Sequence, residues 1–205
     1  MPDPCRLIAF IVFFSLLITR SFSQTDCALR KDIDGVKVFA CRAVNSKIKS
    51  LKTVLEVHAT TQQIIDIVLN VKDYNNWQYH TINAHIVERK SESELIYYTE
   101  IVSPWPASNR DLVVHLKVNH DKAKKQIIIT AHSIPDFIPE KEGIVRVPMS
   151  KSRWIVKPVN ESTLSVEFTM LVDPGGSVPT WLINLVAAQA PYESFRNFKN
   201  KIERH

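Results

Sequence analysis

The side chains best suited to acid–base or metal chemistry are the histidines, and their spacing forms no such site. The internal ones are His58, His80, His85, His115, His120 and His132. None shows the i, i+4 pairing with a glutamate that marks a zinc-protease helix. His115 alternates with Val114 and Leu116 along an expected strand, which places it on the opposite, solvent-facing side. The histidines therefore indicate no metal site.

The motifs of nucleophilic and phosphate chemistry are missing from the sequence as well. The chain has no G-x-S-x-G elbow that would activate a serine. Its four glycines, Gly35, Gly143, Gly175 and Gly176, fall in expected turns and do not form the clustered pattern of a P-loop or a dinucleotide site. We expect no catalytic residue, no metal and no cofactor.

The N-terminal residues predict an export signal. An apolar run from Leu7 to Ile18 follows a basic residue and precedes the small-x-small pattern Ser21-Phe22-Ser23, as in a secretory signal peptide. A membrane anchor is the alternative, but a spanning helix needs about 20 apolar residues. Arg20 ends this run earlier. We expect residues 1–23 to be cleaved and residues 24–205 to form one domain that is periplasmic or secreted.

Two cysteines, Cys27 and Cys41, remain after such a cleavage, in a compartment where disulfides persist. Between them, Asp32 to Val36 resembles a three-residue hairpin loop with Gly35 in the left-handed conformation. Closing this loop places Cys27 directly opposite Cys41. The register favours a disulfide between them over two unpaired, buried cysteines.

The middle of the chain alternates polar and apolar residues in short runs, which predicts antiparallel strands. The first run, residues 48–58, precedes a short amphipathic helix that Thr60 or Thr61 can cap. Short turns join the later runs into an expected meander. These runs are residues 82–89, 95–102, 112–119, 126–132, 144–148, 154–157 and 164–172.

The last segment changes to helical spacing. After the turn at residues 173–177 comes Pro179, which suits a first helical turn. Apolar residues then recur at helical intervals over about 25 residues, with Pro191 as a site for a kink. Many antiparallel strands closed by one long terminal helix predict an α+β fold, with the helix on one face of the sheet.

Three motifs, in the same order and at similar separations, resemble the signatures of START domains, the lipid-transfer domains related to the steroidogenic acute regulatory protein. They are SPWPASNRDLV at 103–113, IPEKEGIVR at 138–146 and VDPGGSVPTWLIN at 172–184. Tyr74-Asn75-Asn76-Trp77 is similar to the family's motif after the first helix. For residues 24–205, the resemblance implies a helix-grip fold: a curved antiparallel β-sheet wrapped round a long C-terminal α-helix, with a tunnel between them for a lipid or another hydrophobic small molecule.

Alternation along the strands, together with this resemblance, assigns a tunnel lining. The expected ligand-binding residues are Tyr97, Thr99, Ile101, Leu112, Val114, Leu116, Phe168, Met170, Leu182 and Val186. The loop of Pro104, Trp105 and Pro106 is expected to act as a gate at the tunnel mouth. Arg110 and Asp111 follow this loop and must point to opposite faces of a strand. We expect one of them to hold the loop in place.

One departure from the family concerns the polar groups of the tunnel. Sterol-binding members place a Glu and an Arg there, where an ungapped alignment puts Tyr97 and Leu116. Tyr97 is the only ionisable group of the expected lining, and Thr99 adds a second hydroxyl. Burying an unpaired charge costs several kcal/mol. We therefore expect a ligand with a hydrocarbon body and a weakly polar end, and charged head groups outside.

Two classes of function fit these residues. The first is binding of a lipid or other hydrophobic ligand, with transfer or sensing. The alternative is a helix-grip enzyme, cyclase-like or hydrolase-like, because one fold can serve several functions. The apolar lining favours binding, since an enzyme would bring ionisable groups together in the tunnel. A domain that has lost its cavity and contacts only other proteins is a third reading.

Composition limits the partners. The chain is mildly basic, with a formal net charge of +5, but its dense Lys/Arg clusters fit solvated surface and lack the interleaved aromatics of a nucleic-acid site. The expected partners are a lipid or hydrophobic small molecule and, transiently, a membrane, with no nucleic acid. The sequence makes no prediction of the oligomeric state.

Overall fold

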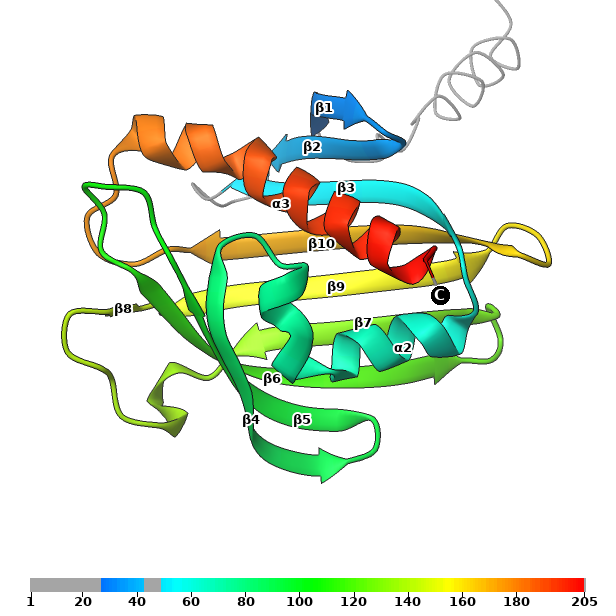
Figure 1. The fold of residues 1–205 in the computed structure, drawn as a ribbon, viewed down its shortest axis with the longest axis horizontal. Helices are drawn as coiled ribbons and strands as arrows, with labels where there is room; N and C mark the ends of the chain where they lie inside the picture. Colours follow the sequence, from blue (N-terminus) through cyan, green and yellow to red (C-terminus); the bar gives the residue numbers. More distant parts are fainter. Residues whose placement is uncertain (1–26, 43–48, 205) are drawn as a thin grey trace, which may run out of the picture.

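A curved antiparallel sheet wraps round a long C-terminal helix (Figure 1). The computed structural model describes residues 27–42 and 49–204; the predicted signal peptide lies outside them. Within the described residues the sheet has ten strands, in the order β1-β2-β3-β10-β9-β7-β6-β5-β4, with β8 beside β6. This arrangement confirms the predicted α+β helix-grip fold. None of the described helices is long and apolar enough to cross a membrane.

The strands are β1 (Cys27–Ile33), β2 (Val36–Arg42), β3 (Lys49–His58), β4 (Thr81–Ser91), β5 (Glu94–Ile101), β6 (Arg110–Asp121), β7 (Gln126–Ser133), β8 (Val145–Arg146), β9 (Met149–Pro158) and β10 (Thr163–Asp173). The helices are α2 (Thr61–Leu69) and α3 (Thr180–Ile202), with short 3-10 helices η2 (Val71–Asn76) and η3 (Pro135–Phe137).

The first hairpin turns differently from the prediction. Ile33 pairs with Val36, so the turn has two residues, Asp34 and Gly35, rather than three. Both have a positive φ, 54° at Asp34 and 74° at Gly35. Tight two-residue turns of this kind match the right-handed twist of the flanking strands. The Asp-Gly pair therefore fixes a shorter turn than the sequence reading assigns.

A bulge in β1 nevertheless restores the predicted cysteine pair. The register shifts by one residue between Leu29 and Lys31, as when one strand carries an extra residue. This shift places Cys27 opposite Cys41, and the two cysteines form a disulfide. The pairing is as predicted, but the bulge and the shorter turn produce it together.

Intact mass of the exported protein should show a chain that begins at Gln24 and is two hydrogen atoms lighter than its reduced form. The bond closes a loop with a sequence separation of 14. Chain-entropy reasoning gives a bond of this loop length about 3 kcal/mol of stability. A mass that matches the reduced chain, in protein exported by its host, would show that the disulfide does not form.

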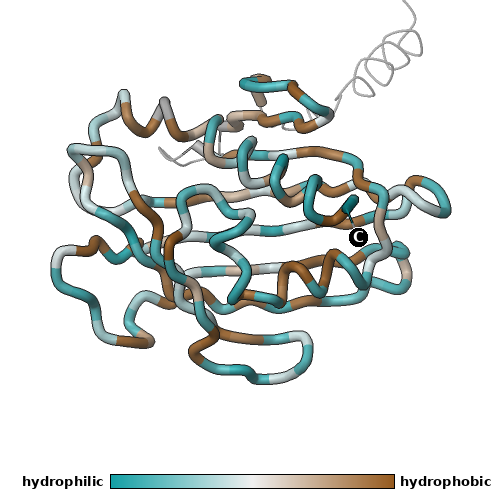
Figure 2. Tube along the Cα trace, viewed as in Figure 1, coloured by the Kyte–Doolittle hydropathy of each residue, from teal (hydrophilic) through white to brown (hydrophobic). Residues whose placement is uncertain are grey.

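The start of α2 follows directly from its sequence. Thr60 is the N-cap: its hydroxyl accepts a hydrogen bond from the Gln63 backbone N–H at 3.2 Å. The Gln63 side chain accepts one from the Thr60 N–H at 2.8 Å, which completes a capping box. Hydrophobic and hydrophilic stretches alternate along the helix (Figure 2). Beyond it, the Tyr74 hydroxyl of η2 donates to the Val68 carbonyl at 2.5 Å and fastens the connection to α2.

Strands β4 to β7, β9 and β10 form the predicted meander, while β3 pairs with its last strand. The segment of α2 and η2 therefore carries the chain from β3 to β4 at the opposite edge of the sheet (Figure 1). The predicted strand at 144–148 is wrong in extent, because β8 has two residues and pairs in parallel with β6. Pro148 follows it closely and has no N–H with which to extend a ladder.

Helix α3 packs against the concave side of the sheet, which we call the inner face. Trp154 of β9 contacts Phe195 and Phe198 of α3, with ring centroids 4.9 Å and 5.5 Å apart. Trp77 adds a further contact with Phe198 at 5.6 Å. All four rings are buried, and aromatic pairs of this kind add about 0.5–1.5 kcal/mol each beyond burial alone. Pro191, the predicted kink site, lies inside α3.

A second, smaller cluster covers the opposite, outer face of the sheet. Ile96 and Tyr98 of β5 are buried there together with Val113 of β6. Ile134 and Ile138, from the segment between β7 and β8, pack over them. Strand β5 is therefore buried on both faces, which explains its nearly continuous apolar run.

Candidate functional site

The predicted lining residues of the strands lie on the inner face, and Leu182 and Val186 lie on α3. Tyr97 pairs with Val114, and Thr99 pairs with Leu112; cross-strand partners point to the same side of a sheet. Tyr97, Thr99, Val114, Leu116 and Leu182 are buried, whereas Ile101, Leu112, Phe168, Met170 and Val186 are partly buried. The predicted lining therefore contains both buried and partly buried residues.

Burial differs among the inner-face positions. Val166 and Val156, which pair across β10 and β9, are fully buried. Four residues further along β10, Met170 is partly accessible, and so is Leu112 at the corresponding end of β6. Met170 and Leu112 are therefore less completely buried than Val156 and Val166.

Small side chains occupy the middle of one inner-face row. The row of paired residues from Leu116 to Met170 passes through Ala131 of β7 and Ser152 of β9. The neighbouring row contains Trp154 instead. Because protein interiors are close-packed, short side chains leave volume that another group must fill.

Buried hydroxyl groups lie on the inner face, at Tyr97, Thr81 and Thr99. Burial raises the pKa of Tyr97, whose ring meets Tyr74 edge-on at 5.3 Å. Among the described residues, nothing hydrogen-bonds the Oγ1 atoms of Thr81 and Thr99, although both are buried. A buried polar atom left without a partner costs about 1–3 kcal/mol. These atoms are therefore suited to bind polar groups of a ligand.

Arg110 adds an ionisable side chain that the predicted lining omits. It pairs with Ile101 and lies two residues before Leu112, so the alternation that turns Leu112 inward also turns Arg110 inward. The residue is 7% exposed. It donates a hydrogen bond to the Ser108 carbonyl of the Pro-rich loop, as one residue of the Arg-Asp pair was expected to do. Burial lowers the pKa of Arg110. The expected lining, in which Tyr97 is the only ionisable group, therefore leaves out this inward-facing side chain.

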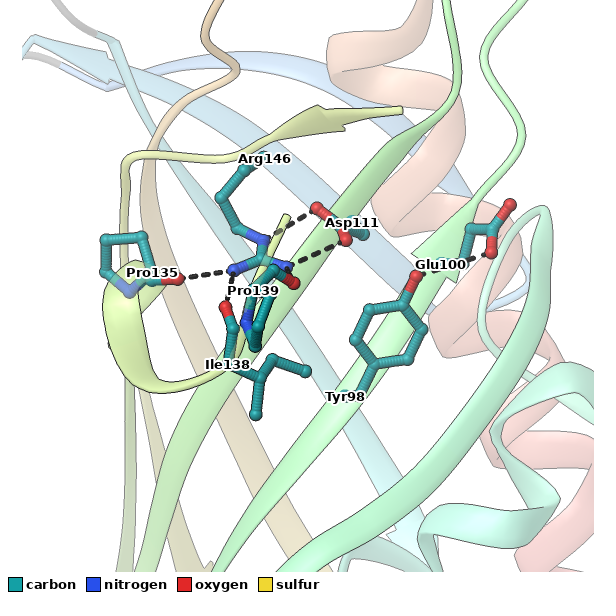
Figure 3. A network of polar contacts seen from close by, with 7 residues as sticks. All are labelled: Tyr98, Glu100, Asp111, Pro135, Ile138, Pro139 and Arg146. Carbon is teal, nitrogen blue, oxygen red and sulfur yellow. Dashed lines mark hydrogen bonds and ion pairs between the residues drawn. The ribbon is translucent and has the colours of Figure 1, made fainter. Parts of the chain in front are cut away.

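Asp111 points to the outer face and pairs with Arg146 (Figure 3). Arg146 Nε lies 2.8 Å from Asp111 Oδ1, and Nη2 lies 3.1 Å from Oδ2. The same guanidinium donates to the carbonyls of Pro135, Ile138 and Pro139. The pair thus fastens the segment between β7 and β8 over the outer face. The Asp111 hydrogen bond and charge raise the pKa of Arg146.

The Gly-Gly turn before α3 is built for close packing. Gly175 has φ of +65°, and a Cβ there would lie 2.8 Å from Pro148 Cδ and 3.2 Å from the Arg146 carbonyl oxygen. A side chain could not fit without moving the backbone. Gly176 follows with φ of +59° and lies beside Arg110, where a Cβ would come 4.0 Å from Nη2. The turn before α3 therefore lies close to the backbone of Arg146 and to the side chain of Arg110.

The predicted gate residues lie at the surface, beyond the end of β5. Trp105 is 88% exposed, and Pro106 is exposed beside it. Trp181 and Ile183, in the first turn of α3, are also exposed at 59% and 40%. Large exposed apolar side chains of this kind mark interaction surfaces when they gather on one part of a protein.

The predicted outward position of His115 agrees with its contacts. Its Nε2 atom lies 2.7 Å from Glu94 Oε1, and its ring faces His132 at 5.1 Å. Burial, followed by the nearby His115 and Lys151, lowers the pKa of His132. In the parts of the chain that the structure describes, no group of three His, Cys, Asp or Glu residues could hold a metal ion.

A sheet that grips a C-terminal helix and turns a partly accessible apolar face toward it defines a helix-grip domain. The START domain family model matches residues 30–205. The chain belongs to this family.

The chain is also similar to individual known proteins. The chain is 28% identical over 179 residues to an uncharacterized protein of Pseudomonas aeruginosa, across 87% of this chain and 88% of that one. It is 29% identical over 128 residues to the phosphatidylcholine transfer protein of Mus musculus, across 60% of this chain and 58% of that protein. The crystal structure of a STAR-related lipid transfer protein (fragment 25–204) from Xanthomonas axonopodis has the same fold, with a TM-score of 0.78, 24% identity, and coverage of 86% of this chain and 98% of that one.

Proposed function

We propose that the protein binds a lipid or other hydrophobic small molecule between the inner face of the sheet and α3, and transfers or senses it. The observation that carries this proposal is the partial accessibility of Leu112, Met170 and Val186, which lie on the sheet and helix faces that should otherwise bury one another. A mostly apolar face with a few polar groups is the usual character of a small-molecule site.

Binding is favoured over catalysis by the chemistry of this face. Its ionisable groups named above are Tyr97 and Arg110, on different rows of the sheet. Catalysis of proton transfer needs an acid or base with a pKa near the working pH, and the raised pKa of Tyr97 moves that phenol further from neutrality. The likeness to a phosphatidylcholine transfer protein supports a lipid as the ligand.

We further propose that the protein acts outside the cytoplasm, as a mature domain of residues 24–205. The Cys27–Cys41 disulfide supports this location, because such bonds persist in oxidising compartments. The apolar run and cleavage pattern in the first 23 residues support it independently.

The ligand-binding proposal can be tested by displacing a fluorescent lipid with candidate lipids from the mature chain. Saturable displacement would support it, and failure of every hydrophobic probe to bind would contradict it. Within this assay, Tyr97→Phe should weaken binding by about 1 kcal/mol, roughly fivefold in Kd, if the phenol bonds a ligand oxygen. Unchanged affinity would exclude that bond. Tyr79→Phe, at a partly buried residue outside the proposed lining, is the matched control.

We propose that the Pro104 to Pro106 loop and the start of α3 form the gate and touch the membrane during lipid exchange. Trp residues favour the membrane interface, where one side is apolar and the other wet. Trp105→Ala should therefore reduce both sedimentation with dioleoylphosphatidylcholine vesicles and the rate of lipid uptake. Val159→Ala, an exposed apolar residue in the β9–β10 turn, should change neither. Equal behaviour of the two variants would count against the membrane contact.

A further inference from the structure

We propose that Arg110, Thr81 and Thr99 bind the oxyanion of a lipid head group inside the domain. The oxyanion is a phosphate or a carboxylate, and it enters with the head of the lipid directed toward the gate loop. This inference rests on the proposed lipid binding and names the head-group chemistry of the ligand. It replaces the expectation that charged head groups remain outside.

The three side chains share the inner face of the adjacent strands β4, β5 and β6. Thr81 of β4 pairs with Ile101 of β5, which pairs with Arg110 of β6. These residues form one row on the inner face. Thr99 lies two residues before Ile101 and so faces the same side in the adjacent row. Diagonal neighbours across strands are close enough for long side chains to reach one another.

Within residues 27–42 and 49–204, the charge of Arg110 has no counter-ion. No acidic side chain among the described residues forms an ion pair with it, and the single hydrogen bond found for it there goes to the Ser108 carbonyl. A guanidinium has five N–H donors. The hydroxyls of Thr81 and Thr99 are also buried and unbonded within the described chain. Among the described residues, the donors on these three strands thus have one acceptor, the Ser108 carbonyl.

Arg146 shows how this domain treats a buried arginine that has only a structural role. A bidentate hydrogen-bonded pair with Asp111 balances its charge, and three backbone carbonyls accept its remaining N–H groups. Arg110 is buried to a similar degree, with 7% of the residue exposed against 6% for Arg146. Among the described residues, however, a single carbonyl accepts a hydrogen bond from it. Burying a charge without a partner is costly, so a ligand that supplies the missing acceptor would bind with a large gain.

An oxyanion fits the donors, and a lipid fits their surroundings. The planar guanidinium fork matches the two oxygens of a carboxylate or phosphate, and a threonine hydroxyl can donate to another. Beside them, Ile101 and Leu112 are partly accessible apolar residues that could contact an acyl chain.

The test uses two pairs of NBD-labelled probes with the mature chain. Phosphatidic acid is compared with diacylglycerol of the same chains, and a fatty acid is compared with the matching fatty alcohol. The wild-type protein should bind at least one acid about tenfold or more tightly than its neutral partner, because hydrogen bonds to charged groups are worth about 1.5–3 kcal/mol. The pair that shows the preference distinguishes phosphate from carboxylate.

Arg110→Met should abolish this preference, because the acid loses its charge-assisted hydrogen bonds to the guanidinium. Arg153→Met, at an exposed arginine of β9, should keep the preference intact. If Arg110→Met does not fold, the double variant Thr81→Val and Thr99→Val tests the site instead. Valine keeps the shape of each threonine without its hydroxyl, so this variant should still lower the preference for the acid severalfold. If the folded variants keep the preference for the acid, the oxyanion site is wrong. It is also wrong if the wild-type protein binds acids and neutral probes equally. Either result would leave the proposed lipid binding unaffected. Binding of none of the four probes would contradict the proposed function itself.

Discussion

Replacing Leu116 by arginine should abolish lipid binding. Leu116 is 3% exposed and lies on the inner face between Leu95 and Ala131. An arginine at this position would bring a charge into an apolar region without a partner, at a cost of several kcal/mol. The arginine side chain would also fill volume that the ligand needs. Displacement of a fluorescent lipid, with circular dichroism as a check of folding, measures the effect.

Two variants serve as controls for this charge. Asn119→Arg adds the same side chain at an exposed position of the same strand and should bind lipid normally. Leu116→Met keeps the volume and the apolar character, and it should cost less than about 1.5 kcal/mol in stability. If Leu116→Arg folds normally and binds as well as the wild type, the inward assignment of β6 and the proposed lining are wrong.

Arg146→Met should destabilise the domain by about 3–5 kcal/mol, because it leaves the carboxylate of Asp111 buried without its partner. The Asp111 side chain is 0% exposed and that of Arg146 is 3% exposed. The variant also loses the hydrogen bonds to the segment between β7 and β8. In a domain of this size the midpoint temperature should fall by roughly 10 °C. Urea unfolding at neutral pH gives the free energy directly.

The control is an ion pair at the surface. Lys37→Met removes the contact with Asp32, whose atoms lie 3.9 Å apart at exposed positions, and should cost less than about 1 kcal/mol. A double variant, Asp111→Asn with Arg146→Met, should recover part of the stability because no charge remains buried. An Arg146→Met protein as stable as the Lys37→Met protein would show that the buried pair does not hold the outer segment.

Local signals in the sequence predicted those elements whose structure depends on near neighbours. Thr60 and Gln63 define the start of α2 because a capping box is formed by residues three apart. Alternation in β5 and β6 assigned the inner face correctly for Tyr97 and Leu116, since a strand has a period of two. The cysteine pair was found as well, although the predicted turn was one residue too long.

The remaining features depend on contacts between distant segments. The outer burial of Tyr98 requires the segment between β7 and β8 to fold over β5, and alternation alone cannot show this cover. Arg110 could have been found, because the same alternation that assigned Leu112 continues to it. Its burial without an ion pair in the described part of the chain could not have been predicted, since that depends on which acidic residues the fold places nearby. The parallel pairing of β8 with β6 is likewise a tertiary result.

The central claim is that a lipid occupies the space between the inner face and α3. Native mass spectrometry of the protein purified from its own host, followed by extraction of any bound mass, tests it most directly. We expect one hydrophobic molecule per chain in the wild-type protein and none in a folded Leu116→Arg protein. A wild-type chain that is free of ligand as isolated, and that stays so after incubation with lipid vesicles, would contradict the account.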